Sequence, residues 1–150
     1  MEDLVYEVEQ EDKLEYALRL WDQAGERPSE VLEEEGLLDF FLEQLERSRY
    51  DLSQVTLYRG GTRNQELQKY NVKDYNYISS WSLSKEIASY FFEGADTKVM
   101  FVLNGPGAIH ALENHYNTYN ELEVIVAPIK LVVTSRVVID SITYLYVTPL

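Results

Sequence analysis

An arginine at the end of an apolar stretch is the first residue of the chain whose type and place suggest chemistry. Leu57 and Tyr58 precede Arg59, and Gly60 and Gly61 follow it. A guanidinium stays charged and offers a planar, bidentate fork that matches a phosphate. A glycine beside it lets a ligand approach the backbone. The segment indicates a phosphate clamp, although a structural arginine before a turn would give the same short pattern.

A serine-rich stretch is the second candidate. It runs Ser80-Trp81-Ser82-Leu83-Ser84. Because alternate residues of a strand share a face, we expect the serines to point one way and Trp81 and Leu83 the other. The pattern indicates hydroxyl groups held in a cleft. The alternative is a half-exposed strand whose last serine caps a helix.

A pair of glutamates is the third candidate. Glu121 and Glu123 flank Leu122 at the start of a β-rich run. Positions i and i+2 of a strand lie on one face, about 6.6 Å apart along the chain. Two carboxylates so close repel each other and are costly to bury together. The pair therefore indicates either a functional site or a solvated strand end.

The first third of the chain has the pattern of helices. Leu14, Ala17, Leu18 and Trp21 recur at spacings of three and four, which predicts an amphipathic helix over residues 11–23. After a break at residues 25–28, Ser29 can cap a second helix. Its apolar face continues through residues 37–45, beyond Gly36, so we expect that glycine to divide it into two short helices.

The remainder is predicted to be mainly strand, with one helix over residues 85–92 that Ser84 caps and Gly94 ends. A helical part followed by many short strands favours an α+β fold with mainly antiparallel strands. We expect one domain over residues 1–150, with an acidic helical part (1–50) and a β-rich part (51–150) that carries the three candidates. The predicted strands span residues 55–58, 77–83, 98–103, 108–112, 122–127, 132–139 and 142–147.

The charge is concentrated in the helical part. Residues 1–50 contain 16 acidic and five basic residues, and the whole chain has a net charge of −13. Phosphate groups repel such a chain, so we expect no nucleic-acid partner and no anionic membrane. The acidic face is either a solvated helix surface or a docking face for a basic partner. No bilayer-length apolar run or signal-peptide pattern occurs in the sequence, so we expect a cytoplasmic protein.

Neither histidine is expected to bind a metal ion. The chain has no cysteine, and His110 and His115 lack clustered acids around them. The segment Gly105-Pro106-Gly107 is predicted to be a turn rather than a phosphate-binding loop.

In this order, the three candidate segments resemble the mono-ADP-ribosyltransferases of the arginine–serine–glutamate (R-S-ExE) type. That group includes bacterial toxins, phage-encoded modifiers and vertebrate ecto-enzymes. The resemblance covers roughly residues 55–130 and implies the family's fold, in which N-terminal helices precede a mainly antiparallel, split β-sheet. Trp81 stands where the family usually has threonine. The chain is also short for the family, so we expect its helical part to be reduced.

The resemblance implies NAD as the co-substrate, no metal, and cleavage of the bond between nicotinamide and ribose. The transition state of this cleavage is oxocarbenium-like, as in glycoside hydrolysis, and Glu123 would stabilise it through the ribose 2′-hydroxyl. Ser80 would orient Glu123. The implied NAD-binding residues are Arg59 on the phosphates, Gly60 with its backbone on the nicotinamide amide, Ser80, Ser82, and Phe91 against nicotinamide.

The same resemblance implies that arginine is the acceptor, because a glutamate two residues before the catalytic glutamate accompanies arginine in this family. A protonated guanidinium is a poor nucleophile, and Glu121 could bind the cation and draw off its proton. Asn117, Tyr119 and Asn120 would form the acceptor-facing loop beside it.

Three functions stay open at this point. The first is transfer of ADP-ribose to arginine of a target protein, in the manner of a toxin or phage modifier in the cytosol of a host cell. The second is NAD hydrolysis with water as the acceptor. The third is a binding module that keeps the fold without the chemistry and uses its acidic face. The presence of Arg59, Ser80 and Glu123 favours the two enzymes.

Overall fold

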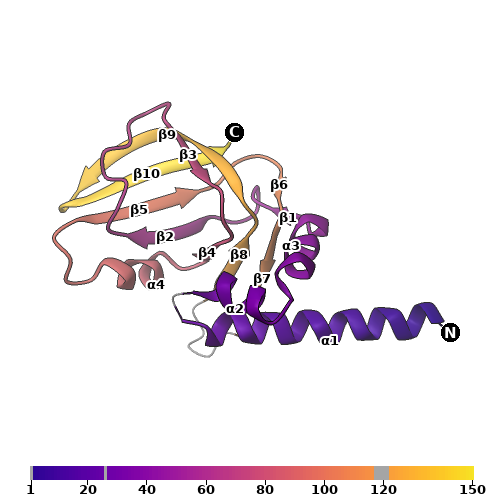
Figure 1. Cartoon of the computed structure of the whole chain (residues 1–150). Helices are drawn as coiled ribbons and strands as arrows, with labels where there is room; N and C mark the ends of the chain where they lie inside the picture. The colour runs from indigo at the N-terminus through magenta and orange to yellow at the C-terminus, as the bar shows by residue number, and fades with distance from the viewer. Residues whose placement is uncertain (1, 26, 117–121) are drawn as a thin grey trace.

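Three helices precede the sheet in the computed structural model, which describes residues 2–25, 27–116 and 122–150. They are α1 (Glu2–Gln23), α2 (Pro28–Glu34) and α3 (Leu38–Arg47). The first helix begins at Glu2 rather than at residue 11 as predicted, because a helix, once nucleated, can propagate by one hydrogen bond per residue without an apolar stripe. Its N-terminal half runs out past the rest of the chain (Figure 1).

The break between α2 and α3 confirms the predicted role of Gly36. This glycine has a φ of 71°, the left-handed conformation that commonly ends a helix. The predicted cap at Ser29 is wrong. Arg27 occupies the N-cap position and Pro28 is the first helical residue. Proline suits that position because its missing N–H would have no partner there.

An eight-stranded sheet forms the other part of the fold. Its strand order is β3-β9-β10-β5-β2-β4-β8-β7, and β1 and β6 make a separate two-stranded sheet. Only β5 and β10 pair in parallel among the described strands. This confirms the predicted α+β class with mainly antiparallel strands. The strands are β1 (Tyr50–Asp51), β2 (Leu57–Gly61), β3 (Val72–Tyr75), β4 (Ser79–Ser82), β5 (Lys98–Leu103), β6 (Ala108–Ile109), β7 (Ala111–Glu113), β8 (Glu123–Val126), β9 (Ile129–Ile139) and β10 (Ile142–Pro149).

Two of these strands were not predicted, and one predicted strand is divided. β3 reads Val-Lys-Asp-Tyr and is an edge strand in which only Tyr75 is buried, so it lacks the apolar pattern that marks a strand. β1 has only two residues, too few for periodicity. The predicted strand over 108–112 is interrupted at His110 and contributes to both sheets.

The large sheet is split between β2 and β4. Within the described residues, one ladder pair, Tyr58 with Ser82, joins these two strands. The two parts of the sheet share one core, in which Trp81, Val124 and Val126 of the smaller part pack with residues such as Phe101 and Leu145 of the larger part. Helices α1–α3 cover the outer face of β7 and β8 (Figure 1). Helix α4 (Lys85–Ser89) and the 3-10 turn η1 (Tyr90–Phe92) cover the outer face of β2 and β5.

The cap of α4 agrees with the prediction. Ser84 Oγ accepts a hydrogen bond from the backbone N–H of Ile87 at 3.2 Å. The α-helix ends at Ser89 and a 3-10 turn continues to Phe92, so the predicted helix over 85–92 is present in two forms.

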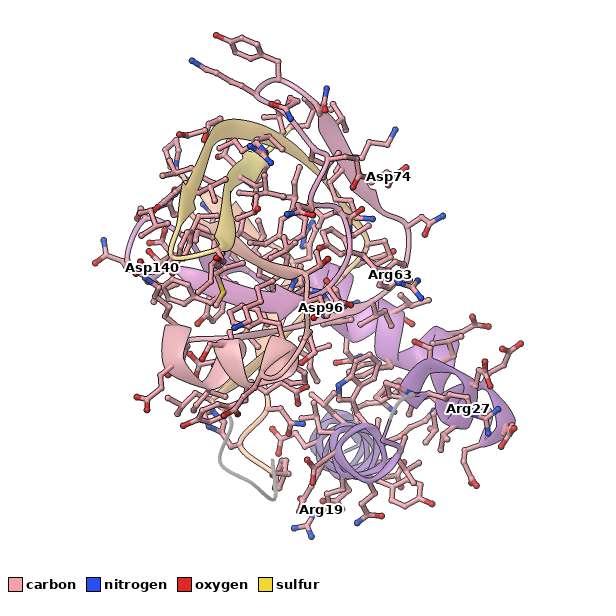
Figure 2. The ribbon with its side chains drawn as sticks, turned by 90° about the vertical axis from the view of Figure 1, so that its left-hand side faces the viewer. Arg19, Arg27, Arg63, Asp74, Asp96 and Asp140 are labelled. Atoms are coloured by element: carbon pink, nitrogen blue, oxygen red, sulfur yellow. The ribbon has the colours of Figure 1, made fainter. Side chains whose placement is uncertain are left out.

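Charged side chains lie mostly on the outside of the helical part. Arg19 and Arg27 extend away from the sheet (Figure 2), and many acidic side chains of α1–α3 are exposed as well. Among the described residues, no helix is both long and apolar enough to span a membrane.

Candidate active site

A cleft of about 350 Å³ lies where the sheet splits and the helices meet it. Every predicted catalytic or NAD-binding residue that the structure describes lines this cleft: Arg59, Gly60, Ser80, Ser82, Phe91 and Glu123. The predicted acceptor residues Asn117, Tyr119, Asn120 and Glu121 lie outside the described residues. The structure thus brings together three sequence segments that were singled out separately.

Glu123 is the first residue of β8 and is only 8% exposed. In β8, Val124 and Val126 face the sheet core, so Glu123 and Ile125 face the helices. Three described side chains donate hydrogen bonds to its carboxylate. Ser80 Oγ and Trp21 Nε1 reach Oε2 at 2.5 and 3.2 Å, and Asn114 Nδ2 reaches Oε1 at 2.9 Å. A buried carboxylate needs such donors to replace water.

The two serines of the Ser-x-Ser segment share a face, as predicted, but make different contacts. Ser80 bonds Glu123 directly. Ser82 is the ladder partner of Glu123 across β4 and β8, and its Oγ accepts a hydrogen bond from the N–H of Ser84 at 3.0 Å. Ser82 therefore shapes the turn into α4 while it lines the cleft.

Trp81 lies on the opposite face of β4, in the sheet core. Its ring meets Tyr75 and Phe101 edge-on, with centroids 5.8 and 6.4 Å away. Its indole N–H donates to Ser79 Oγ at 2.8 Å. The large side chain at the middle of the serine motif is thus accommodated by packing and leaves the Ser80–Glu123 hydrogen bond intact.

Arg59 is held at the split in the sheet. One guanidinium nitrogen donates to the carbonyl of Ser80 at 2.7 Å, and the guanidinium lies 5.6 Å from the ring centroid of Tyr75. Burial raises the pKa of the Tyr75 hydroxyl above its usual range, and the Arg59 charge opposes that rise. Of the described residues that line the cleft, Arg59 is the only base, and Asp22 and Glu123 are the acids.

Helix α4 passes directly over Gly60, where there is no side chain to obstruct it. A Cβ atom at this position would lie 2.0 Å from the carbonyl oxygen of Ala88. The glycine therefore lets β2 and α4 approach closely, a role separate from any contact with a ligand. Phe91, on η1, lines the same cleft and is 63% exposed.

The chain enters β8 through a left-handed residue. Leu122 has a φ of 52°, which is uncommon for a residue with a side chain and is found mainly where the surroundings enforce it. Its carbonyl accepts a hydrogen bond from Leu83 N–H at 3.0 Å. The strand begins at Glu123, one residue after the predicted start at residue 122. The expectation that Glu121 and Glu123 share a face depends on Glu121, which lies outside the described residues, and it stays a prediction.

Trp21 and Asn114 are site residues that the sequence analysis missed. Trp21 was assigned to an apolar helix stripe, and its ring does pack there, 5.6 Å from Phe41. Asn114 falls in a segment predicted to be a polar loop. A signal existed for Trp21, since a buried indole usually finds a partner for its N–H. No pattern in the sequence distinguishes Asn114 from its polar neighbours.

The two histidines lie apart from the cleft lining. His110 Nδ1 is 2.9 Å from the carbonyl of Ser48, and His115 Nε2 is 3.6 Å from Glu113. In the part of the chain that the structure describes, no three His, Asp or Glu side chains gather as metal ligands would.

Comparison with solved structures identifies the fold. The chain superposes on the ADP-ribosyltransferase Vis of Vibrio splendidus in complex with agmatine, with a TM-score of 0.58 and 18% identity, over 97% of this chain and 70% of Vis. Exoenzyme S of Pseudomonas aeruginosa, bound to carba-NAD and human 14-3-3 protein beta, gives a TM-score of 0.65 and 16% identity, over 92% of this chain and 74% of that chain. C3stau2 of Staphylococcus aureus with NAD gives a TM-score of 0.65 and 13% identity, over 93% and 87% of the two chains.

No protein-family profile matches the chain, and no curated protein matches it by sequence. The sequence identities to the solved structures are low, so the likeness is one of fold. The chain has an ADP-ribosyltransferase-like fold, as the order of its three motifs predicted.

Proposed function

We propose that the protein is a mono-ADP-ribosyltransferase that cleaves NAD and transfers ADP-ribose to arginine of a target protein. The observation that carries this proposal is the hydrogen bond of 2.5 Å between Ser80 and Glu123, in a cleft that also contains Arg59. The three residues come from separate strands and meet where the sheet splits.

The cleft suits a dinucleotide such as NAD. Its volume of about 350 Å³ falls within the range of ligand pockets, although part of a dinucleotide would extend outside. Arg59 offers a guanidinium for the pyrophosphate, Glu123 offers a carboxylate for a ribose hydroxyl, and Phe91 offers an aromatic face for nicotinamide.

The proposed reaction begins with cleavage of the bond between ribose C1′ and the nicotinamide nitrogen. The electron pair of that bond leaves with nicotinamide, whose positive charge is thereby neutralised, so no strong acid is required. Charge develops on the ribose, and the fixed Glu123 carboxylate stabilises it electrostatically. An arginine nitrogen then bonds to C1′ while its proton passes to a base, the role proposed for Glu121.

Arginine as the acceptor rests on Glu121 and on the segment of Asn117, Tyr119 and Asn120 before it. Agmatine, which is bound to Vis in one of the solved structures, carries the same guanidinium group as arginine. With water as the acceptor, the same cleft would release free ADP-ribose, and NAD hydrolysis is therefore the second candidate. It requires only Arg59, Ser80 and Glu123.

The target protein would approach across the acidic helical part. Exposed acids there include Glu11, Asp12, Glu30, Glu33, Glu34 and Asp39. They favour a basic surface on the partner and would speed the encounter. Such an enzyme would act in the cytosol of an infected or intoxicated host cell.

The test is incubation of the protein with labelled NAD and a cell lysate, with nicotinamide release measured in parallel. Label on a protein band, removable by conditions that cleave arginine-linked ADP-ribose, supports transfer. Release of ADP-ribose without protein labelling supports hydrolysis. A folded protein that produces neither would leave the binding module as the function.

Glu121→Gln separates the two enzymatic functions. We expect protein labelling to be lost while nicotinamide release is largely kept, because only the guanidinium acceptor needs this carboxylate. Glu113→Gln is the matched control, since Glu113 bonds Tyr50 and does not line the cleft. Equal loss of both activities in Glu121→Gln would place Glu121 in bond cleavage instead.

A further inference from the structure

Two buried donors outside the predicted motifs converge on Glu123. Trp21 comes from α1 and Asn114 follows β7, and they are 5% and 4% exposed. Trp21 Nε1 donates to Oε2 at 3.2 Å and Asn114 Nδ2 donates to Oε1 at 2.9 Å. Together with Ser80 they surround the carboxylate from the helical part, from β4 and from the segment after β7.

These donors limit how many further hydrogen bonds the Glu123 carboxylate can accept. An ionised carboxylate has about four lone-pair sites on its two oxygens. Ser80 and Trp21 both use Oε2, and Asn114 uses Oε1. The described donors therefore leave one site, and it belongs to Oε1.

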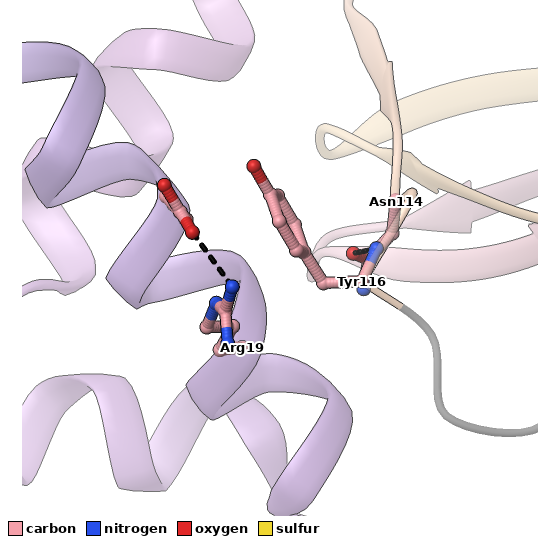
Figure 3. Close-up of polar contacts among 4 residues, drawn as sticks. Arg19, Asn114 and Tyr116 are labelled. Atoms are coloured by element: carbon pink, nitrogen blue, oxygen red, sulfur yellow. Dashed lines mark hydrogen bonds and ion pairs between the residues drawn. The ribbon is translucent and has the colours of Figure 1, made fainter.

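The orientation of the Asn114 amide is determined by its neighbours. Its Oδ1 accepts from the backbone N–H of Tyr116 at 3.1 Å, and a backbone N–H can only donate, so Nδ2 must face Glu123. The backbone N–H of Asn114 also donates to the carbonyl of Glu123 at 2.9 Å. The Tyr116 ring lies beside the guanidinium of Arg19 of α1, whose carbon is 4.9 Å from the ring centroid, and Arg19 is ion-paired with Glu15 (Figure 3).

The orientation of Trp21 is determined by the helical core. Its ring packs against Phe41 of α3 within a cluster that includes Leu18 and Leu45. An indole N–H can only donate. The packing of α1 on α3 therefore places the Trp21 indole N–H against the Glu123 carboxylate. In this buried region an unpaired N–H would cost free energy.

We propose that Trp21 and Asn114 are positioning residues, which hold the Glu123 carboxylate in its reactive orientation and, among the described donors, leave one Oε1 site for a substrate hydroxyl. This inference rests on the proposed function. Donors that are already in place need no reorganisation during the reaction, which is how a fixed carboxylate stabilises developing charge best. A purely structural role would affect only the stability of the fold.

Steady-state kinetics of nicotinamide release separates the two roles. We expect Trp21→Phe and Asn114→Ala each to lower kcat by about 10- to 100-fold, the effect of losing a hydrogen bond to a charged group, with a smaller change in KM for NAD. Phe41→Leu is the matched control, because it loosens the same helical cluster without touching Glu123. It should lower the unfolding temperature and keep kcat.

Folded Trp21→Phe and Asn114→Ala proteins with wild-type kcat would overturn the positioning role while the proposed function stands. A kcat loss in Phe41→Leu as large as in Trp21→Phe would also overturn it, since destabilisation alone would then account for the effect. A wild-type protein that releases no nicotinamide would overturn the proposed function and the positioning role together.

The contact can also be tested without activity. The chain has two tryptophans, and their indole N–H groups have different acceptors, Glu123 for Trp21 and Ser79 for Trp81. In a ¹⁵N–¹H spectrum, Glu123→Gln should shift the Trp21 indole resonance and leave that of Trp81 in place. An unmoved Trp21 resonance would overturn the hydrogen bond on which the proposal depends.

Discussion

The two walls of the cleft differ in what they contribute. The strand wall, formed by β2, β4 and β8, carries Arg59, Ser80 and Glu123. The helical wall, formed largely by α1, α2 and the α4 region, contributes Trp21, Pro28 and Phe91 among others. The strand wall supplies charged and hydroxyl groups, whereas the helical wall supplies mostly shape and aromatic surface. The polar exceptions on the helical wall are Asp22, whose carboxylate lines the cleft, and Trp21, whose indole N–H connects the helical wall to the carboxylate of the strand wall.

The residues proposed for chemistry and those proposed for positioning are encoded differently in the sequence. Groups on a strand are placed by alternation, so a short motif suffices to identify them. Groups on the helical wall are placed by how helices pack on the sheet, which depends on residues far apart in the sequence. Trp21 and Glu123, for example, are 102 residues apart.

The largest effect should come from the strand wall, through Glu123→Gln. The change keeps the size of the side chain but removes the charge that, in the proposed reaction, stabilises the oxocarbenium-like transition state. Nicotinamide release should fall by about 10²–10³-fold. Glu66→Gln, an exposed change away from the cleft lining, should have no effect on the rate. Near-native activity in a folded Glu123→Gln protein would show that the proposed role of Glu123 is wrong. The strand wall would then contribute no more to the reaction than the helical wall.

Gly60→Ala tests where the two walls touch. Its Cβ would lie 2.0 Å from the Ala88 carbonyl oxygen, so α4 or β2 must shift. We expect the free energy of unfolding to fall by about 1–3 kcal/mol, measured by chemical denaturation. Gly61→Ala is the matched control, since a Cβ there meets nothing within 4 Å. Equal stability of the two variants would show that α4 does not constrain β2.

Arg59→Lys should have the smallest of these effects. Lysine keeps the charge but loses the bidentate fork, so the Kd for NAD should rise by about tenfold in a calorimetric titration. Arg63→Lys, an exposed change just beyond β2, provides the control. Unchanged NAD binding by a folded Arg59→Lys protein would identify Arg59 as a structural residue that serves the Ser80 carbonyl alone.

Much of the strand wall was predictable from sequence. Alternation correctly separated Ser80 and Ser82 from Trp81, and the Ser84 cap was found from its place before a helical segment. The left-handed Leu122 just before β8 was not predicted, because no local pattern marks that conformation in leucine. Edge strand β3 escaped prediction because three of its four residues are not buried.

Apart from Phe91, the helical wall was predictable as helix but not as part of a site. The apolar stripe identified Trp21 as buried, yet periodicity treats an indole as a hydrocarbon and does not consider its N–H. Asn114 could not be found at all, since its role arises from the chain returning beside β8.

The sparse pairing of β2 with β4 has a consequence for the geometry of the cleft. Within the described residues, one ladder pair and the Arg59–Ser80 hydrogen bond connect these two strands, and the shared core packs the two parts of the sheet together. One part of the sheet carries the Arg59 guanidinium, and the other carries the Glu123 carboxylate. A change in the angle between the two parts would therefore alter the span between these two groups, while the pairing within each part could stay the same.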